Sequence, residues 1–357
     1  MNNLTLFGWD EFFEKQFQNF SGEEFSAGRV IRENKNNYIV ATESGDLTGE
    51  LSGKFYFNTE NKSDFPAVGD WVILRPLHDE GKGIIESIMQ RKSKFSRKTA
   101  LNKTDEQIIA SNIDFIFLVT SLNLDTNPRR IERYLTLAYE SNITPVIVLS
   151  KSDLCGNIED IYGDIKFIAG DTDICVVSAY DNSGIEQLNK YFSGNRTVAF
   201  VGSSGVGKST LINLLSGKEI MAVRDISTYK DKGRHTTSHR ELTVLPNGGI
   251  IIDTPGMREL QMWEGGEGIS ETFSDIENYI SMCRFSDCSH SSEPGCAVKS
   301  AIENGELDED RYRNFIKLQK EIRYFENRNN RKAALSEKKK WKKITAEAKK
   351  NNKQRFK

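Results

Sequence analysis

The amino-acid sequence predicts a multidomain protein with a small N-terminal β-barrel, a central α/β domain and a helical C-terminal domain. Short strand-like segments recur about every ten residues between 24 and 90. Longer apolar strands alternate with helical segments from 105 onward, and strand signals stop after 258. At 357 residues the chain is long enough for several separate cores. The expected parts are 1–95, 96–258, 259–330 and a basic tail at 331–357.

The N-terminal part combines a helical segment with five short strands. Residues 1–20 have the pattern of a short amphipathic helix. The strands that follow are FSAGRVIRE, NNYIVATE, LTGELSGKFYF, GDWVILRP and GIIESIM. Five strands in so short a stretch fit an OB-fold, a barrel that often binds oligonucleotides. An SH3-like barrel without that role would show the same pattern, and the basic stretch 91–98 is expected to be a linker.

The central part alternates strands and helices, which predicts a mostly parallel sheet with helices on both faces. The first strand, IDFIFLVT at 113–120, is continuously apolar. A helix is predicted at 128–141, with Pro128 in its first turn. Its apolar face consists of Ile131, Leu135, Ala138 and Tyr139. Five more strands are predicted at TPVIVLS, ICVVSA, TVAFVG, ELTVLP and GIIIDTPG.

Beyond 258 the pattern is helical, and the end of the chain is strongly basic. One helical face in this region is formed by Tyr312, Phe315, Ile316, Gln319, Ile322 and Phe325. Residues 311–357 hold 18 Lys and Arg against 4 Asp and Glu, so they carry +14 and the rest of the chain −16. Such a tail favours a polyanionic partner, nucleic acid first. A solvated lysine-rich helix without a partner is the alternative.

The composition is that of a cytoplasmic protein with no membrane partner. The chain is 37% hydrophobic and 28% charged, and it contains no apolar run long enough to span a bilayer. Its first residues include acidic side chains and lack an apolar core segment, so they do not have the pattern of a signal peptide.

Residues 202–210, GSSGVGKST, match the phosphate-binding pattern G-x-x-x-x-G-K-[ST] between a strand and a helix. The glycines let backbone N–H groups converge on a phosphate. In such loops the lysine neutralises the β- and γ-phosphates and the hydroxyl ligates Mg²⁺. The expected nucleotide-binding residues here are Gly202, Ser203, Ser204, Gly205, Val206, Gly207, Lys208, Ser209 and Thr210. A structural glycine turn is the alternative, and the Lys-Ser pair disfavours it.

Two further segments complete the expected magnesium site. IIIDTPG ends a strand with D-x-x-G, so Asp253 can hold Mg²⁺ through water and the Gly256 N–H can contact the γ-phosphate. The polar stretch 232–242 has the position of a switch loop, in which Thr236 or Thr237 supplies a hydroxyl. We favour Thr237. The Mg²⁺ ligands are then expected to be Ser209, Thr237 and Asp253.

A base-reading motif comes earlier in the chain. SKSD at 150–153 follows a strand and matches Asn-Lys-x-Asp except at its first residue. The Asp153 carboxylate can accept from the N1–H and amine of guanine, which adenine does not offer, so guanine selectivity is expected to persist. VVSA follows the next strand and offers backbone N–H groups to the guanine O6. The expected base-side residues are Ser150, Lys151, Ser152, Asp153, Ser178 and Ala179.

These segments are in an unusual order. Base-reading elements, phosphate loop, switch loop and D-x-x-G form a cyclic shift of the order found in ordinary GTPases. A sheet tolerates such a shift because the termini of a domain usually lie close together on its surface. A single circularly permuted nucleotide domain therefore explains all four segments.

Three of the five cysteines lie within 14 residues of one another. With one histidine they offer three thiolates and an imidazole, a set suited to a tetrahedral structural Zn²⁺. The expected ligands are Cys283, Cys288, His290 and Cys296. Three unrelated buried thiols are the alternative. Cys155 and Cys175 stand alone and are expected to be ordinary small residues.

With these motifs the chain resembles the circularly permuted, ribosome small-subunit-dependent GTPase A family of bacteria. The resemblance covers nearly the whole length and includes VGDWV at 68–72, GRHTT at 233–237 and CRFSDCSHSSEPGC at 283–296. It implies an OB-fold, a permuted GTPase domain and a C-terminal zinc domain. It also implies GTP hydrolysis stimulated by the 30S subunit and a checkpoint role in late maturation of that subunit. Ser150 departs from the Asn or Thr usual in the family.

Hydrolysis requires a positioned water. Met257 follows D-x-x-G, where many GTPases carry Gln, and it cannot orient water. His235 is the nearest candidate in the sequence, and the resemblance supports it; a surface histidine without a catalytic role is the alternative. The expected catalytic residues are His235, Lys208 and Thr237.

We therefore expect a monomeric GTPase with slow intrinsic turnover that binds GTP and GDP, the 30S subunit and 16S rRNA. Its barrel, zinc domain and basic tail would make the ribosomal contacts, with GTP favouring docking and hydrolysis favouring release. One alternative is an RNA-binding switch protein that uses GTP as a conformational ligand on another RNA. A GTPase that acts on another RNA or in metal handling is the other.

Overall fold

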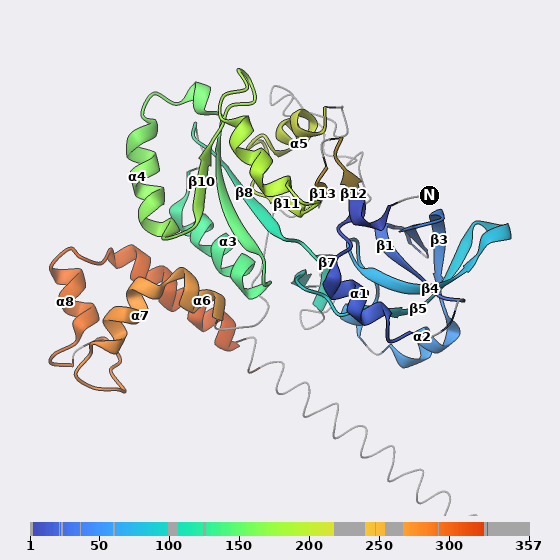
Figure 1. Ribbon diagram of the computed structural model, residues 1–357. Coiled ribbons are helices and arrows are strands. Elements are labelled where there is room, and N and C mark those ends of the chain that lie inside the picture. Colours follow the sequence, from blue (N-terminus) through green and yellow to red (C-terminus); the bar gives the residue numbers. More distant parts are fainter. Residues whose placement is uncertain are drawn as a thin grey trace, which may run out of the picture.

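The computed structural model describes residues 3–324 and 327, apart from 21, 23, 36, 60, 99–105, 124–125, 218–239, 247, 254–266 and 292. The described chain forms a barrel, an open α/β sheet and a helical part, in the predicted order (Figure 1). The basic tail at 331–357 lies outside the described residues.

The first twenty residues form two short helices, where the sequence predicted one. They are η1 (Leu4–Phe7), a 3₁₀ turn, and α1 (Glu11–Phe17). Gly8 separates them with a φ of 83°, a left-handed conformation that ends helices and favours glycine. The Asp10 side chain then caps α1. Phe13 of α1 packs against Trp71 in a cluster separate from the barrel interior.

Five strands close into the predicted barrel: β1 (Ser26–Glu33), β2 (Tyr38–Thr42), β3 (Gly45–Leu51), β4 (Trp71–Leu77) and β5 (Lys82–Ile88). They follow the order β1-β2-β3-β5-β4, and β4 pairs back onto β1. β3 and β5 are parallel, and the other pairs are antiparallel. Alternate side chains, including Val30, Val40, Val72 and Ile85, fill the interior.

Two local predictions near the barrel are wrong. The strand predicted to continue through Phe57 ends at Leu51, and Ser52 caps the helix α2 (Gly53–Asn58). Residues 91–98 are more than a linker, because β6 (Lys94–Lys98) pairs with β7 (Glu106–Ser111). Short 3₁₀ turns also occur at η2 (Lys62–Asp64) and η3 (His78–Glu80). Pairing partners and caps decide such short segments, and a short sequence pattern does not contain them.

The open sheet is mostly parallel, as predicted. Its strands are β8 (Phe115–Ser121), β9 (Thr144–Ser150), β10 (Asp173–Val176), β11 (Thr197–Val201), β12 (Glu241–Val244) and β13 (Ile250–Asp253). They lie in the order β10-β9-β8-β11-β13-β12, and β12 runs antiparallel to β13. β11 is central, flanked by a strand from earlier and a strand from later in the chain. That arrangement agrees with a cyclic shift of the chain.

Helices cover both faces of this sheet. One face carries α3 (Pro128–Glu140) and α4 (Ile158–Ala169); the other carries η5 (Ile185–Phe192) and α5 (Lys208–Ser216) (Figure 1). Side chains alternate along β8, with Ile116 and Leu118 in the core under α3 and Phe117 and Val119 in the core under α5. The predicted doubly covered sheet is confirmed.

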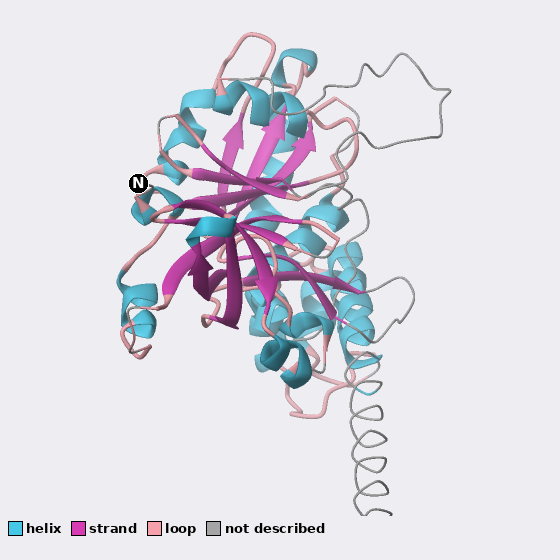
Figure 2. Cartoon of the chain, turned by 90° about the vertical axis from the view of Figure 1, so that its right-hand side faces the viewer, coloured by secondary structure: helices cyan, strands magenta, loops and turns pink. Residues whose placement is uncertain are grey.

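The barrel and the open sheet are joined through backbone pairing and a buried arginine. β12 pairs with β1, so the strands of the barrel and of the open sheet form one continuous sheet through the middle of the molecule (Figure 2), while β6 and β7 form a separate two-stranded sheet. Arg29 on β1 is 1% exposed and donates to the carbonyls of Gly69 and Asn112 and to the Thr197 hydroxyl. Burial lowers the pKa of this guanidinium to about 10. Since Thr197 begins the strand that leads to the phosphate loop, these bonds hold that strand against the barrel.

The C-terminal part is helical and packs against α3. Its helices are α6 (Glu267–Thr272), α7 (Ser274–Ser281), α8 (Ala297–Glu303) and a helix at 309–324. A Cβ on Gly268 would lie 2.4 Å from the Thr136 carbonyl oxygen, so glycine permits the close approach of α6 to α3. On the predicted face of the last helix Phe315 and Ile322 are buried and Tyr312, Ile316 and Gln319 are half-buried, while Phe325 lies outside the described residues. Leu318, which was not assigned to that face, is buried as well.

Candidate functional site

The phosphate loop lies between β11 and α5, as its motif requires. Gly202, Gly205 and Gly207 have φ values of 152°, 83° and 97°, a region that favours glycine. A Cβ on Gly202 would lie 2.1 Å from the Val119 carbonyl oxygen, which leaves no room for a side chain. The fold therefore uses these glycines for the curvature that brings backbone N–H groups together.

Lys208 lies over this loop. Its Nζ donates to the carbonyl oxygens of Gly202 (2.8 Å) and Ser203 (2.6 Å). Ser204 and Gly205 are exposed at the tip of the loop, whereas Val206 is buried beneath it. The cation is thus held against the loop that is expected to bind the phosphates. Ser209 and Thr210 follow, half-buried, in the first turn of α5.

The base-reading motif lies directly beside the phosphate loop. Ser150, the last residue of β9, is 3% exposed. Its hydroxyl lies 2.6 Å from the Val206 carbonyl oxygen and 3.2 Å from that of Thr120. Segments 56 positions apart in the chain therefore meet through one side chain. The serine departs from the family pattern, yet it joins the two halves of the site.

The polar groups expected to read guanine come together at the ends of β9 and β10. Lys151 has a left-handed φ of 59°, and the short turn η4 (Ser152–Leu154) follows it. The Ser178 hydroxyl, fully buried, donates to the exposed Asp153 carboxylate at 2.6 Å and accepts from the Tyr180 N–H. Ala179 between them is half-buried. The hydrogen bond orients the carboxylate expected to bind the base.

The magnesium side of the site is described in part. Asp253 ends β13, which runs parallel to β11, so its backbone lies at the same sheet edge as the phosphate loop. The side chain of Asp253 is not among the described ones. His235, Thr237 and Gly256 lie outside the described residues.

Sequence reasoning missed Arg130. It lies in the first turn of α3, and its guanidinium donates to the Ser203 hydroxyl at 2.5 Å. A signal was present in the sequence, because Arg129 and Arg130 stand together in a first helical turn, where the helix dipole disfavours cations. Such a pair indicates that other groups compensate the charges.

A buried ion-pair network joins α3 to the C-terminal helix, and it too was missed. Glu132 is fully buried and accepts from Arg311 (2.6 Å), Asn314 (2.6 Å) and Arg129 (3.2 Å). Arg311, 3% exposed, also binds Asp275 at 2.8 Å. Burial alone would lower the pKa of the Arg311 guanidinium, but the Asp275 and Glu132 carboxylates outweigh it and raise that pKa.

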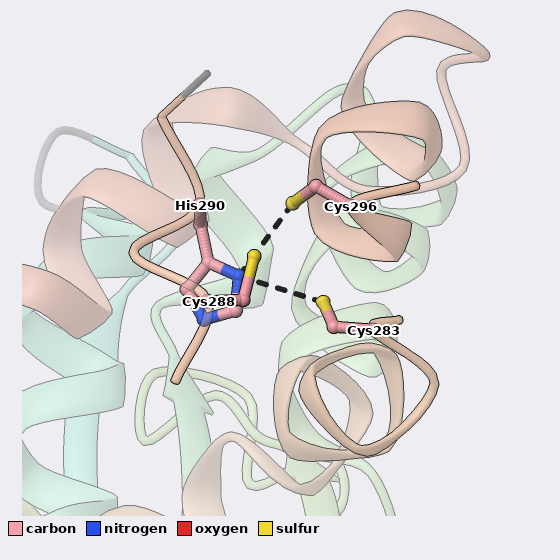
Figure 3. A group of neighbouring side chains, drawn as sticks. All are labelled: Cys283, Cys288, His290 and Cys296. Atoms are coloured by element: carbon pink, nitrogen blue, oxygen red, sulfur yellow. Dashed lines mark hydrogen bonds between the residues drawn. The ribbon is translucent and has the colours of Figure 1, made fainter. Parts of the chain in front are cut away.

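The predicted metal ligands come together in the C-terminal part. Figure 3 shows the side chains of Cys283, Cys288, His290 and Cys296 pointing toward one another, and their ligand atoms all lie within 4.8 Å of each other. The His290 Nδ1 is 3.6 Å from the sulfurs of Cys283 and Cys296. A tetrahedral zinc with Zn–S of about 2.3 Å and Zn–N of about 2.0–2.1 Å separates sulfur and nitrogen by about 3.6 Å. The four residues therefore fit a tetrahedral zinc ion.

Neighbouring residues hold this cluster in place. Glu293 accepts from the backbone N–H groups of Ser289 (2.8 Å) and Ser291 (3.0 Å), on either side of His290. Glu293 also accepts from the Ser289 hydroxyl. That hydroxyl, followed by the backbone N–H groups, lowers the pKa of Glu293 to about 2. The Tyr312 ring packs edge-on against His290. Burial, followed by the nearby thiols, raises the pKa of the Tyr312 hydroxyl. Such surrounding contacts fix the orientation of ligands.

The chain is similar to known GTPases over nearly its whole length. The RsgA GTPase family model matches residues 88–263. Small ribosomal subunit biogenesis GTPase RsgA 1 of Oceanobacillus iheyensis is 42% identical over 350 residues, covering 98% of this chain and 99% of that protein. Small ribosomal subunit biogenesis GTPase RsgA of Opitutus terrae is 41% identical over 350 residues, covering 96% and 95%.

Two solved structures share the fold. YjeQ from Thermotoga maritima is 29% identical with a TM-score of 0.63, covering 84% of this chain and 98% of that one. YloQ, described as a circularly permuted GTPase, is 29% identical with a TM-score of 0.60, covering 84% and 96%. The permuted sheet, the phosphate loop and this extent of identity lead to one conclusion: the chain belongs to the RsgA GTPase family.

Proposed function

We propose that this protein binds guanine nucleotide, hydrolyses GTP and acts in late maturation of the small ribosomal subunit. The observation that carries the proposal is the contact of Ser150 with the Val206 carbonyl, which supports a shared site for the SKSD segment and the GSSGVGKST loop. A single nucleotide can occupy both. Membership of the RsgA GTPase family supports hydrolysis, and relatives named small ribosomal subunit biogenesis GTPase support the biological role.

Lys208, which contacts the Gly202 and Ser203 carbonyls, is proposed to donate to the β- and γ-phosphates when nucleotide binds. Ser209, Asp253 and Thr237 would hold Mg²⁺, whose charge offsets the charge that develops on the transferred phosphoryl group. Gly256 is proposed to contact the γ-phosphate through its N–H. These roles explain why the motifs follow neighbouring strands, whose ends share one edge of the sheet.

The catalytic water is proposed to be oriented by His235. Met257 follows the D-x-x-G motif and has no donor or acceptor suited to water. His235 lies in the GRHTT stretch between the phosphate loop and D-x-x-G, so a switch movement can bring it to the γ-phosphate. Slow intrinsic hydrolysis and stimulation by a bound partner follow from a residue that must first be positioned.

The Cys₃His cluster is proposed to hold one structural zinc ion. Its four ligands leave no open position, so the ion would stabilise the C-terminal part and take no part in hydrolysis. Cys296 is 3% exposed and belongs to the core that extends from α3. Metal binding would therefore stabilise the surface that packs on the nucleotide domain.

The partner is proposed to be the 30S subunit, bound through 16S rRNA by the barrel, the zinc domain at 259–330 and the basic tail at 331–357. The charge of +14 on residues 311–357 supports contact with RNA phosphates. No described helix combines the length and apolar character of a membrane span. We propose a monomer that works in the cytoplasm, where ribosomal subunits mature.

Titration of GTPase activity with 30S, 50S and 70S particles tests the proposal. We expect phosphate release to rise with 30S and to remain near its intrinsic rate with 50S. Lys208→Ala is the control, since it removes the phosphate-binding cation while leaving the fold. Binding to 30S in the presence of GTP without increased phosphate release would favour the alternative, an RNA-binding switch that uses GTP as a conformational ligand.

A further inference from the structure

Ser203 of the phosphate loop is held by two cationic side chains from different elements. Lys208 of α5 donates to its carbonyl oxygen at 2.6 Å, and Arg130 of α3 donates to its hydroxyl at 2.5 Å. All three residues are half-buried, so these bonds are only partly exposed to competition from water.

The two bonds differ in what happens when a nucleotide binds. The Lys208 ammonium has to share its three N–H donors between the loop carbonyls and the phosphates, so its hold on the Ser203 carbonyl is divided when a nucleotide binds. The bond from Arg130 is to a side-chain hydroxyl, which a nucleotide does not need, so it can persist undivided in the bound state. In that state Arg130 would be the described cation whose bond to Ser203 is not shared with the phosphates.

The start of α3, which carries Arg130, is attached to the C-terminal part. The neighbouring Arg129 binds Asp308 at 2.8 Å and also contacts the buried Glu132. Glu132 in turn binds Arg311, so the first two turns of α3 are fastened to the C-terminal helix. A side chain that starts from a fastened turn has little freedom to drift, which is the condition for precise positioning.

We propose that Arg130 is a positioning residue for GTP hydrolysis, acting through the Ser203 hydroxyl to hold the part of the phosphate loop beside the β- and γ-phosphates. The inference rests on the proposed GTPase activity and deepens it. Backbone N–H groups further along the loop cradle the α- and β-phosphates. Loss of the Arg130 bond should therefore impair turnover of the triphosphate more than binding of GDP.

The test compares Arg130→Ala, Arg130→Lys, Ser203→Ala and the double Arg130→Ala/Ser203→Ala variant of the full-length protein. Intrinsic GTP turnover is measured without ribosomal particles, and GDP affinity is measured with a fluorescent GDP. We expect Arg130→Ala to lower kcat about tenfold, the size of one lost charge-assisted hydrogen bond, and to change GDP affinity less than about twofold. Ser203→Ala should match it, the double variant should add no further loss, and Arg130→Lys should recover part of the rate.

Arg133→Ala is the matched control. It removes an arginine one turn along the same helix that pairs with Glu321 at 2.7 Å, away from the loop, and it should leave kcat unchanged. The inference would be overturned if Arg130→Ala kept the wild-type kcat. It would also be overturned if adding Arg130→Ala to Ser203→Ala lowered kcat as much as Arg130→Ala does alone. If Arg130→Ala does not fold, wild-type kcat in Ser203→Ala would overturn it as well. Absence of turnover in the wild type would instead refute the proposed function, and this inference with it.

Discussion

The buried pair of Glu132 and Arg311 makes a quantitative prediction about how the C-terminal part is attached. Arg311→Ala removes a guanidinium that is 3% exposed and bound to Glu132 at 2.6 Å, to Asp275 at 2.8 Å and to the Thr272 carbonyl at 3.0 Å. Glu132 is then left as a buried carboxylate without its closest charge partner. Removal of one member of a buried pair typically costs about 3–5 kcal/mol.

The cost here should lie near the lower end of that range. Asn314 still donates to Glu132 at 2.6 Å, and Arg129 still lies within 3.2 Å. We expect Arg311→Ala to lower the free energy of unfolding by about 3 kcal/mol, which corresponds to a fall in Tm of about 6–12 °C for a unit of 150–250 residues. Adding Glu132→Gln should restore part of the loss, because the neutral amide removes the unpaired charge.

The assay is thermal and urea unfolding of the single and double variants, with Arg313→Ala as the matched control. Arg313 is on the same helix but is 66% exposed and pairs with Glu309, so its removal should cost less than about 0.5 kcal/mol. If Arg311→Ala unfolds within about 1 kcal/mol of the wild type, Glu132 does not carry a buried charge. The proposed attachment of the two parts would then be wrong.

Four further predictions concern the nucleotide site, the metal and pH. Asp153→Asn should weaken GTP binding by orders of magnitude and improve binding of xanthosine triphosphate, whose 2-oxo group accepts from the new amide; competition binding measures both. Ser150→Ala should lower stability by about 1–3 kcal/mol and weaken nucleotide binding, measured by urea unfolding and fluorescent GDP, because it removes the buried link to the phosphate loop. Cys288→Ser, or a strong chelator, should release the zinc detected by a colorimetric reagent and lower the Tm. A hydrogen bond from the Tyr191 hydroxyl, followed by one from Lys190, lowers the pKa of Asp173 in the folded protein. The ionised carboxylate therefore stabilises the fold at pH values above about 3.9, its pKa in the unfolded chain, and this contribution is lost as the pH falls through the lower pKa of the folded state. Asp173→Asn should therefore differ from the wild type in Tm at pH 7 and converge with it below about pH 4.

Each of these has an outcome that contradicts it. Unchanged GTP affinity in Asp153→Asn would remove the carboxylate from the base site. Wild-type stability in Ser150→Ala would show that the hydroxyl does not link the two motifs. Retention of stoichiometric zinc after Cys288→Ser would exclude that thiol as a ligand. A constant difference in Tm between Asp173→Asn and the wild type at every pH would mean that the carboxyl titrates normally.

Local patterns predicted most of the architecture and the segments that form the candidate site. The phosphate loop was readable because G-x-x-x-x-G-K-[ST] records both the backbone conformation and the charge in consecutive residues, and the φ values of Gly205 and Gly207 agree with it. The sheet strands were readable because a strand buried on both faces is continuously apolar. The metal set was readable because its four ligands are close in sequence and of the types that zinc prefers.

Some failures involve a partner elsewhere in the chain, whereas the Gly8 break and the Ser52 cap are local. Residues 94–98 became a strand because 106–111 pairs with them, and Leu318 is buried beside the predicted face because of how the last helix lies in the core shared with α3. The contact of the Ser150 hydroxyl with the Val206 carbonyl was not predicted, because neither the strand pattern around Ser150 nor the spacing of its motif reveals a carbonyl 56 positions away.

By itself, the sequence determined which segments are candidates to bind phosphate, base and metal, since each of those chemistries depends on residue types at short, fixed spacings. It also determined the permuted order, which is a property of the chain alone. Only the tertiary structure decided that Arg130 reaches the loop, that Glu132 and Arg311 neutralise each other in the core, and that barrel and nucleotide domain share one sheet. Those contacts depend on distances between elements, and such distances are set when the whole chain packs.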